Sequence, residues 1–99
     1  MEYNLEKRTK LFGIEVIRFV NSISKNNINA IIINQLVRSA TSIGANYCEA
    51  NGASSKRDFK NKIYICKKEA RETKYWLELL SQTNTRYREK IRLLNRRFI

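Results

Sequence analysis

The chain has 99 residues, of which 42% are hydrophobic and 29% are charged; this length and composition are typical of one globular domain and not of a disordered chain. Twenty Lys and Arg side chains against nine Asp and Glu give a formal net charge of +11, and proteins this basic commonly bind phosphate-bearing polymers. The sequence contains no histidine, which excludes Ser-His and Cys-His nucleophile pairs and the Glu-x-x-His sites of di-iron bundles.

The first predicted helix runs from about Leu5 to Ser24. Its apolar residues recur at steps of three and four, which is the period of an amphipathic helix; they are Phe12, Val16, Phe19, Val20 and Ile23. The polar residues 25–27 form the turn that ends it.

The second predicted helix runs from about Asn29 to Ala50 and ends at Asn51-Gly52, a helix-stop signal. Its core stripe is formed by Ile32, Leu36, Ala40, Ile43 and Tyr47. A polar stripe lies on another side, formed by Gln35, Ser42, Asn46 and Glu49 and flanked by Arg38 and Ser39. These side chains either bond across a helix interface and fix its register, or form a hydrated surface.

The third predicted helix begins at residues 55–58, which resemble a capping box with Asp58 in place of the usual Glu. A regular alternation of steps of four and three indicates a packed seam over three heptads, formed by Phe59, Ile63, Cys66, Ala70, Thr73, Leu77 and Leu80. Residues 82–85 end this helix, and a short fourth one, from about Arg86 to Ile99, is expected to bury Tyr87, Ile91, Leu94 and Phe98. Short links favour an all-α, antiparallel up-down-up-down four-helix bundle that forms a single domain over residues 1–99.

The two cysteines, Cys48 and Cys66, are expected to be small apolar fillers, and no metal or cofactor site is predicted. The longest aliphatic run, Ala30 to Ile33, is far too short to span a membrane. Without a recognisable signal segment after Met1, the expected compartment is the cytoplasm.

The positive charge is concentrated late in the chain, because residues 56–99 carry fourteen basic and five acidic side chains, a net charge of +9. One face of the third helix holds Lys56, Arg57, Lys60, Tyr64, Lys67, Lys68, Arg71, Lys74 and Tyr75, with Glu78 as the one acidic intruder. Cations interleaved with aromatic rings are suited to contacting phosphates and stacking on unpaired bases. The candidate nucleic-acid surface therefore consists of these nine residues together with Arg92, Arg96 and Arg97 of the fourth helix. The alternative is a solvated helix face whose tyrosines cover the edge of the core.

A third face of the same helix is semi-apolar, formed by Ile65, Glu69, Glu72, Trp76 and Leu79. One bundle does not bury two opposite stripes, so this face is predicted to contact another subunit, with Trp76 as anchor. The polar stripe of the second helix joins it as the candidate oligomer interface. The alternative is scattered surface hydrophobes, which have no special role.

Two segments resemble a known family. Residues 35–50 resemble the helix-two signature of the four-helix-bundle proteins encoded in intervening sequences of bacterial 23S rRNA genes, and residues 58–59, 65–73 and 75–77 resemble that family's third helix. The family is itself similar to the accessory protein of diversity-generating retroelements, which binds nucleic acid and a reverse transcriptase. The resemblance implies an antiparallel bundle that assembles as a ring, commonly a pentamer, with a basic surface for RNA or DNA and no enzymatic activity.

Carried onto this sequence, the family's recurrent polar positions are Arg38, Ser42, Asn46 and Glu49, and its acidic positions in the third helix are Glu69 and Glu72. Many members have Gly where this chain has Ala50, and members usually continue into a longer, more acidic fourth helix than residues 86–99.

The sequence thus predicts a non-enzymatic, homo-oligomeric bundle that binds nucleic acid, RNA rather than DNA. The alternative is a protein–protein scaffold or an accessory subunit of a polymerase-type partner, for which contact with nucleic acid is incidental.

Overall fold

A computed structural model describes residues 4–96 of the chain. Within these residues the protein is all-α, as predicted, with four α-helices and a short 3-10 helix. The elements are α1 (Leu5–Asn21), α2 (Asn27–Asn51), α3 (Lys56–Thr83), η1 (Thr85–Tyr87) and α4 (Arg88–Arg96). The expected burial of Phe98 and the predicted RNA contact of Arg97 lie outside the described residues.

Side-chain caps set the starts of the three long helices. The side-chain oxygens of Asn4, Asn26 and Ser55 accept hydrogen bonds from backbone N–H groups three residues later, which satisfies donors that a helix leaves open at its first turn. Ser55 acts as the predicted capping residue, and α3 begins at Lys56. The sequence placed the end of the first helix three residues too late and the start of the second two residues too late.

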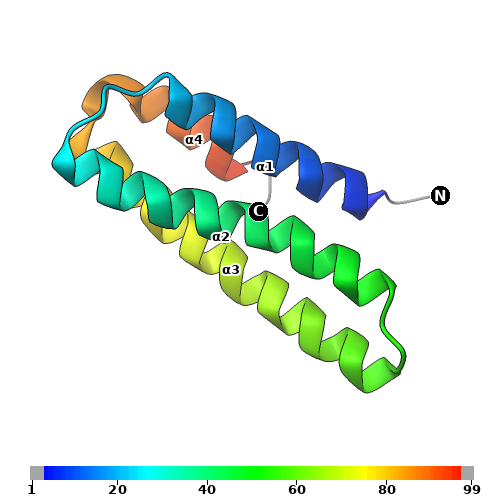
Figure 1. The fold of residues 1–99 in the computed structure, drawn as a ribbon. Coiled ribbons are helices and arrows are strands. Elements are labelled where there is room, and N and C mark those ends of the chain that lie inside the picture. The colour runs from blue at the N-terminus through cyan, green and yellow to red at the C-terminus, as the bar shows by residue number, and fades with distance from the viewer. Residues whose placement is uncertain (1–3, 97–99) are drawn as a thin grey trace.

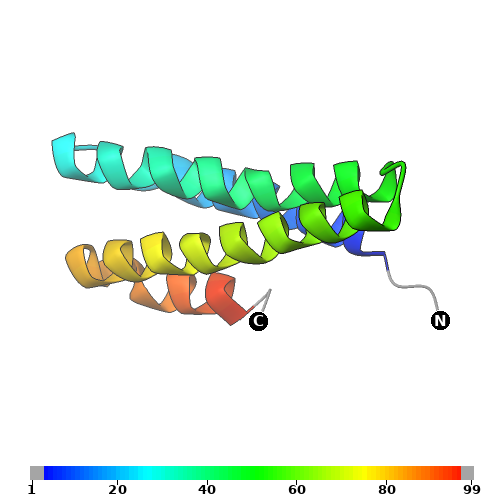
Figure 2. The ribbon, with the colours of Figure 1, turned by 90° about the horizontal axis from the view of Figure 1, so that it is seen from below.

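Neighbouring helices in the bundle run antiparallel (Figures 1 and 2). Between α2 and α3, the start of one contacts the end of the other: Asn29 bonds to Asn84, and Glu49 bonds to Lys62 at the opposite end. Between α1 and α2, Glu6 accepts a hydrogen bond from the Asn51 amide at 2.8 Å. The short α4 returns alongside the C-terminal half of α3 (Figure 2).

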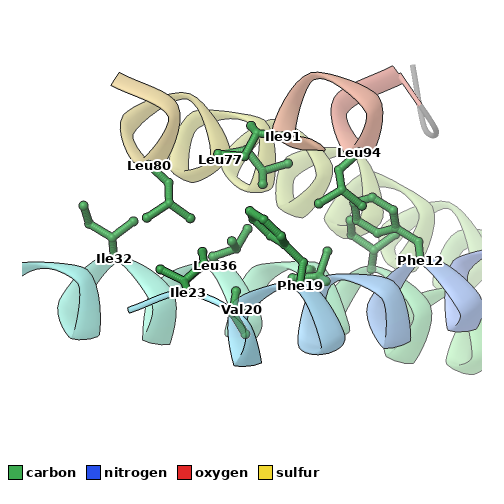
Figure 3. Close-up of a cluster of buried hydrophobic side chains, with 13 residues drawn as sticks. Phe12, Phe19, Val20, Ile23, Ile32, Leu36, Leu77, Leu80, Ile91 and Leu94 are labelled. Atoms are coloured by element: carbon green, nitrogen blue, oxygen red, sulfur yellow. The ribbon is translucent and has the colours of Figure 1, made fainter. Parts of the chain in front are cut away.

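One hydrophobic core joins all four helices at the end of the bundle where α4 lies (Figure 3). The stripes predicted for the first two helices are confirmed from Phe12 to Ile43, whereas Tyr47 is only half-buried. From α3 and α4 the core receives Leu77, Leu80, Ile91 and Leu94. Each fully buried Leu or Ile side chain stabilises the fold by about 1.5–3 kcal/mol.

The predicted core stripe of α3 is wrong at its start. Phe59 is 40% exposed, and Ile63 and Cys66 are only half-buried. The reason is the length of α4, whose nine residues span about 14 Å against about 42 Å for the 28 residues of α3. Leu94 and Asn95, near the end of α4, line a small cavity with Ala70, so the first half of α3 has no fourth-helix neighbour.

A pair of side-chain amides links the first turn of α2 to the residue that follows α3. The side chains of Asn29 and Asn84 donate to each other at 3.0 Å in both directions. Asn29 is 3% exposed and also donates to the Ser24 carbonyl oxygen at 2.9 Å. Because both amides are hydrogen-bonded, burying Asn29 and half-burying Asn84 costs little. No helix within residues 4–96 combines the length and apolar character needed to span a bilayer.

Candidate nucleic-acid interface

All nine residues that the sequence assigned to the basic face of α3 are exposed. Tyr64 and Tyr75 are 69% and 54% exposed, so their rings are accessible to a ligand. From Lys56 to Lys74 the face extends about 27 Å along the helix. In the following, "basic face" denotes these nine residues of α3.

No ion pair within the part of the chain that the structure describes includes a cation of the basic face. The ion pairs among residues 4–96 join Arg38 to Glu69 and Glu72, Lys62 to Glu49, and Arg92 to Glu89. None of them includes a cation of the basic face. The face therefore presents seven basic side chains to solvent, and Glu78 is an exposed carboxylate on the same side of α3.

The two arginines of α4 in the candidate surface, Arg92 and Arg96, differ in their pairing. Arg92 is ion-paired with Glu89 one turn earlier, and the hydrogen bond from Arg92 lowers the pKa of the Glu89 carboxyl. Arg96 is exposed. Because α4 runs beside the C-terminal half of α3 (Figure 2), these two arginines lie far from Lys56 and Arg57.

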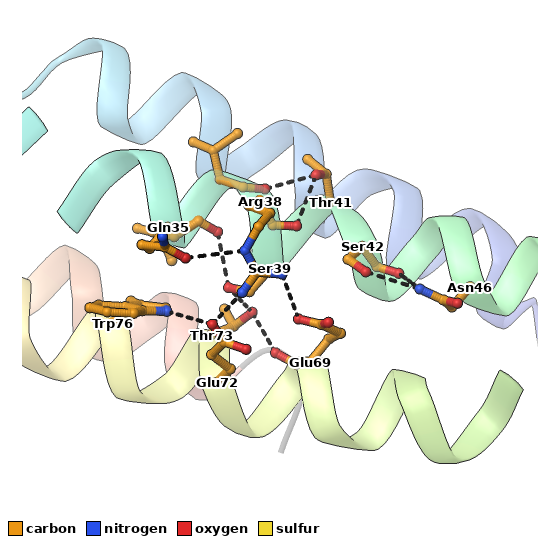
Figure 4. Close-up of polar contacts among 12 residues, drawn as sticks. Gln35, Arg38, Ser39, Thr41, Ser42, Asn46, Glu69, Glu72, Thr73 and Trp76 are labelled. Atoms are coloured by element: carbon orange, nitrogen blue, oxygen red, sulfur yellow. Dashed lines mark hydrogen bonds and ion pairs between the residues drawn. The ribbon is translucent and has the colours of Figure 1, made fainter. Parts of the chain in front are cut away.

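A polar network joins the middle of α2 to the middle of α3 (Figure 4). Arg38 donates to Gln35 at 3.1 Å, to Glu69 at 3.3 Å, and to Glu72. The Trp76 indole N–H donates to Glu72 at 3.1 Å. The hydrogen bond from Trp76, followed by that from Arg38, lowers the pKa of the Glu72 carboxyl.

The network corrects the prediction that the third face of α3 lies opposite the core. Glu69 is 8% exposed, and Trp76 and Leu79 pack against the core cluster. At about 100° per residue, Glu69 and Trp76 both lie about 40–60° to the same side of the buried Thr73, and α2 lies on that side. The face is thus partly covered by α2 of the same chain, and only its outer edge remains accessible to a second subunit.

The polar stripe of α2 is mostly used within the chain as well. Glu49 pairs with Lys62 of α3 at 2.7 Å, and the Asn46 amide donates to the Ser42 hydroxyl and carbonyl oxygens at 2.9 Å, inside α2. Of the two interpretations left open, bonding across a helix interface is therefore right for Arg38 and Glu49.

Two exposed isoleucines, Ile28 and Ile31, were not predicted from the sequence; they are 61% and 63% exposed. They lie on the side of α2 that carries Gln35, level with the C-terminal turns of α3 where Leu79 lies. The apolar run at residues 30–33 already indicated an exposed apolar side chain. Successive residues of a helix point about 100° apart, so four in a row do not all face one core. These two residues and the partly exposed Trp76 and Leu79 of α3 are together called the isoleucine patch below.

The cysteines differ from each other. Cys66 is half-buried, its thiol donates to the Ile43 carbonyl oxygen at 3.4 Å, and burial raises its pKa, which fits the predicted filler. Cys48 is exposed and donates to Glu6, so the filler prediction is wrong there. Among residues 4–96, no three His, Cys, Asp or Glu side chains are grouped as metal ligands would be.

Comparisons with known proteins place these features in a family. The family described as 23S rRNA-intervening sequence protein matches residues 2–98 of the chain. A crystal structure of a protein of unknown function from the S23 ribosomal protein family of Bacteroides thetaiotaomicron is similar, with a TM-score of 0.81 and 36% sequence identity over 93% of this chain and 85% of that one. No curated protein matches the chain.

Proposed function

The chain belongs to the 23S rRNA-intervening sequence protein family, and from this premise we propose that it is a non-catalytic, homo-oligomeric protein that binds RNA in the cytoplasm through the basic face of α3. We propose that the homo-oligomer is a pentameric ring, the assembly that the family resemblance implies.

The observation that carries the proposal is the set of seven exposed cations on one helix face, none of them ion-paired within residues 4–96. Each phosphate that such a cation neutralises releases counterions, which favours binding at moderate salt. The exposed Tyr64 and Tyr75 add flat surfaces for unpaired bases. Unpaired bases are commoner in structured RNA than in duplex DNA, and this favours RNA.

The isoleucine patch supports assembly into a homo-oligomer. Ile28 and Ile31 are more than half exposed, and Trp76 lies beside the exposed Tyr75 with ring centroids 5.0 Å apart. Large apolar side chains gathered on one surface favour contact with another subunit. Assembly would repeat the basic face in each copy, and several faces on one RNA strengthen binding without any new contact.

The test is charge reversal on the basic face. We expect Lys67, Lys68 and Arg71, changed together to Glu, to abolish binding of structured RNA at low salt while the helical circular dichroism signal is retained. The matched control reverses three exposed cations elsewhere: Lys7, Lys10 and Lys25. Both variants change the net charge equally, so equal losses of affinity would show that overall charge acts instead of this face.

A protein scaffold gives a different result. If the basic face binds an acidic protein, a tagged chain retains that partner after nuclease treatment, and purified RNA shows no preference for the wild-type chain over the charge-reversed variant. That outcome would replace RNA by a protein ligand.

A further inference from the structure

A shallow groove lies on the N-terminal half of α3, next to the basic face and partly formed by it. Its lining residues are Phe59, Lys60, Ile63, Tyr64 and Lys67, and its volume is about 240 Å³. Phe59 is 40% exposed and Tyr64 is 69% exposed. The groove therefore combines an apolar floor with two lysines.

The groove is open because the bundle has no fourth helix at this end. Phe59 and Ile63 continue the seam that Leu77 and Leu80 occupy in the core, but α4 ends near the level of Ala70. In the figures α2 and α3 extend well beyond α4 (Figures 1 and 2). Apolar area left in water at Phe59 favours an occupant that covers it.

The charge of the groove decides which occupant fits. Lys60 and Lys67 are two turns apart, about 10.5 Å along the helix, and neither is ion-paired within residues 4–96. No carboxylate lines the groove. A second copy of this chain, with its net charge of +11, would bring like charges to these lysines.

A nucleotide has the complementary pattern, since its flat base covers apolar and aromatic side chains while the phosphates on either side meet cations. We propose that this groove binds one unpaired nucleobase of the RNA, with its ring against Phe59 and Tyr64 and its flanking phosphates at Lys60 and Lys67. The inference rests on the proposed RNA binding and adds the class of RNA.

Such a site selects RNA with splayed bases. In an A-form duplex the bases are stacked and paired, and side chains do not reach their faces. A continuous duplex therefore contacts only the cations of the basic face, whereas a loop, bulge or single strand also fills the groove. We expect the protein to prefer hairpins with unpaired loops over duplexes of equal length.

The experiment uses the full chain with two fluorescent RNA probes, a hairpin with an unpaired loop and a fully paired duplex of equal phosphate number. Phe59→Leu keeps the apolar cover but removes the ring, and Tyr64→Ala removes a side chain that is mostly in solvent. Loss of one base–aromatic contact weakens binding by about fivefold to about a hundredfold. We expect this loss for the hairpin and a change below about twofold for the duplex. Leu11→Ala, a change at an exposed leucine of α1, is the control and should change neither.

Three outcomes overturn the inference. Unchanged hairpin affinity in both variants would show that no base occupies the groove, and equal losses for hairpin and duplex would show that the groove does not distinguish unpaired bases. A lower molar mass of Phe59→Leu in light scattering, with hairpin affinity per chain unchanged, would assign the groove to a subunit contact. In all three the RNA-binding proposal stands. If the wild-type chain binds neither probe at low salt, the proposed function fails and the inference fails with it.

Discussion

Removing the Arg38 side chain tests the central network between α2 and α3. Arg38→Ala deletes the hydrogen-bonded cation shared by Glu69 and Glu72. Glu72 keeps its bond from Trp76, but Glu69 is buried and loses its bond from Arg38. A buried carboxylate without its partner destabilises the folded state, because the cost of removing it from water is no longer offset.

The exposure of the three side chains sets the magnitude. Arg38 is 47% exposed, whereas Glu69 is 11% and Glu72 is 34% exposed. Breaking a fully buried ion pair costs about 3–5 kcal/mol, and breaking an exposed one costs at most about 1 kcal/mol. The network lies between these limits, and we expect Arg38→Ala to lower the free energy of unfolding by about 1–2 kcal/mol. For a chain of this length, each kcal/mol shifts Tm by about 4–8 °C.

The assay is thermal and urea unfolding at one fixed protein concentration, since assembly also affects stability. Arg57→Ala is the control, because it removes the same charge from an exposed side chain with no ion pair within residues 4–96. The double variant Arg38→Ala/Glu69→Gln should recover part of the loss by removing the isolated charge. If Arg38→Ala unfolds at the same temperature as Arg57→Ala, the network does not stabilise the fold.

Three further outcomes follow from the structure. Asn29→Ala should lower the free energy of unfolding by about 1–3 kcal/mol in urea titrations, because it removes the hydrogen bonds that the buried amide makes to Asn84 and to the Ser24 carbonyl oxygen; an unchanged urea midpoint would contradict this. The pKa of Glu72 is lowered from its ordinary value of 4.5 in the folded state, so its stabilisation is present above that pH and declines as the pH falls further. Urea midpoints should therefore drop on acidification, less steeply in Glu72→Gln than in the wild-type chain, and equal slopes would refute this. Ile31→Glu places a charge in the isoleucine patch and should lower the molar mass in light scattering, whereas an unchanged mass would exclude the patch as a subunit contact.

Features that depend on a single helix were predictable from the sequence. The apolar spacing in α1 and α2 identified the core from Phe12 to Ile43, and the Ser55 cap located the start of α3. The exposure of the basic face followed in the same way, because helical geometry alone puts those residues on one side. Its binding of RNA remains a prediction.

Features that depend on a neighbouring helix were not predictable. The seam of α3 continues to Phe59 in sequence, but whether a position on a seam is buried depends on where α4 ends. Arg38 and Glu69 are 31 residues apart in the chain, and the spacing within either helix does not show that they meet. For the same reason the third face of α3 was assigned to another subunit, although α2 of the same chain covers part of it.

The salt dependence of RNA affinity tests the central claim most directly. If about six cations of the basic face contact phosphates of a single-stranded or looped RNA, the logarithm of the binding constant should fall with the logarithm of salt concentration at a slope of about −4. In the variant with Lys67, Lys68 and Arg71 changed to Glu, any residual binding should show a slope shallower by about 2. A wild-type slope near zero, or the same slope in both proteins, would contradict RNA binding through this face.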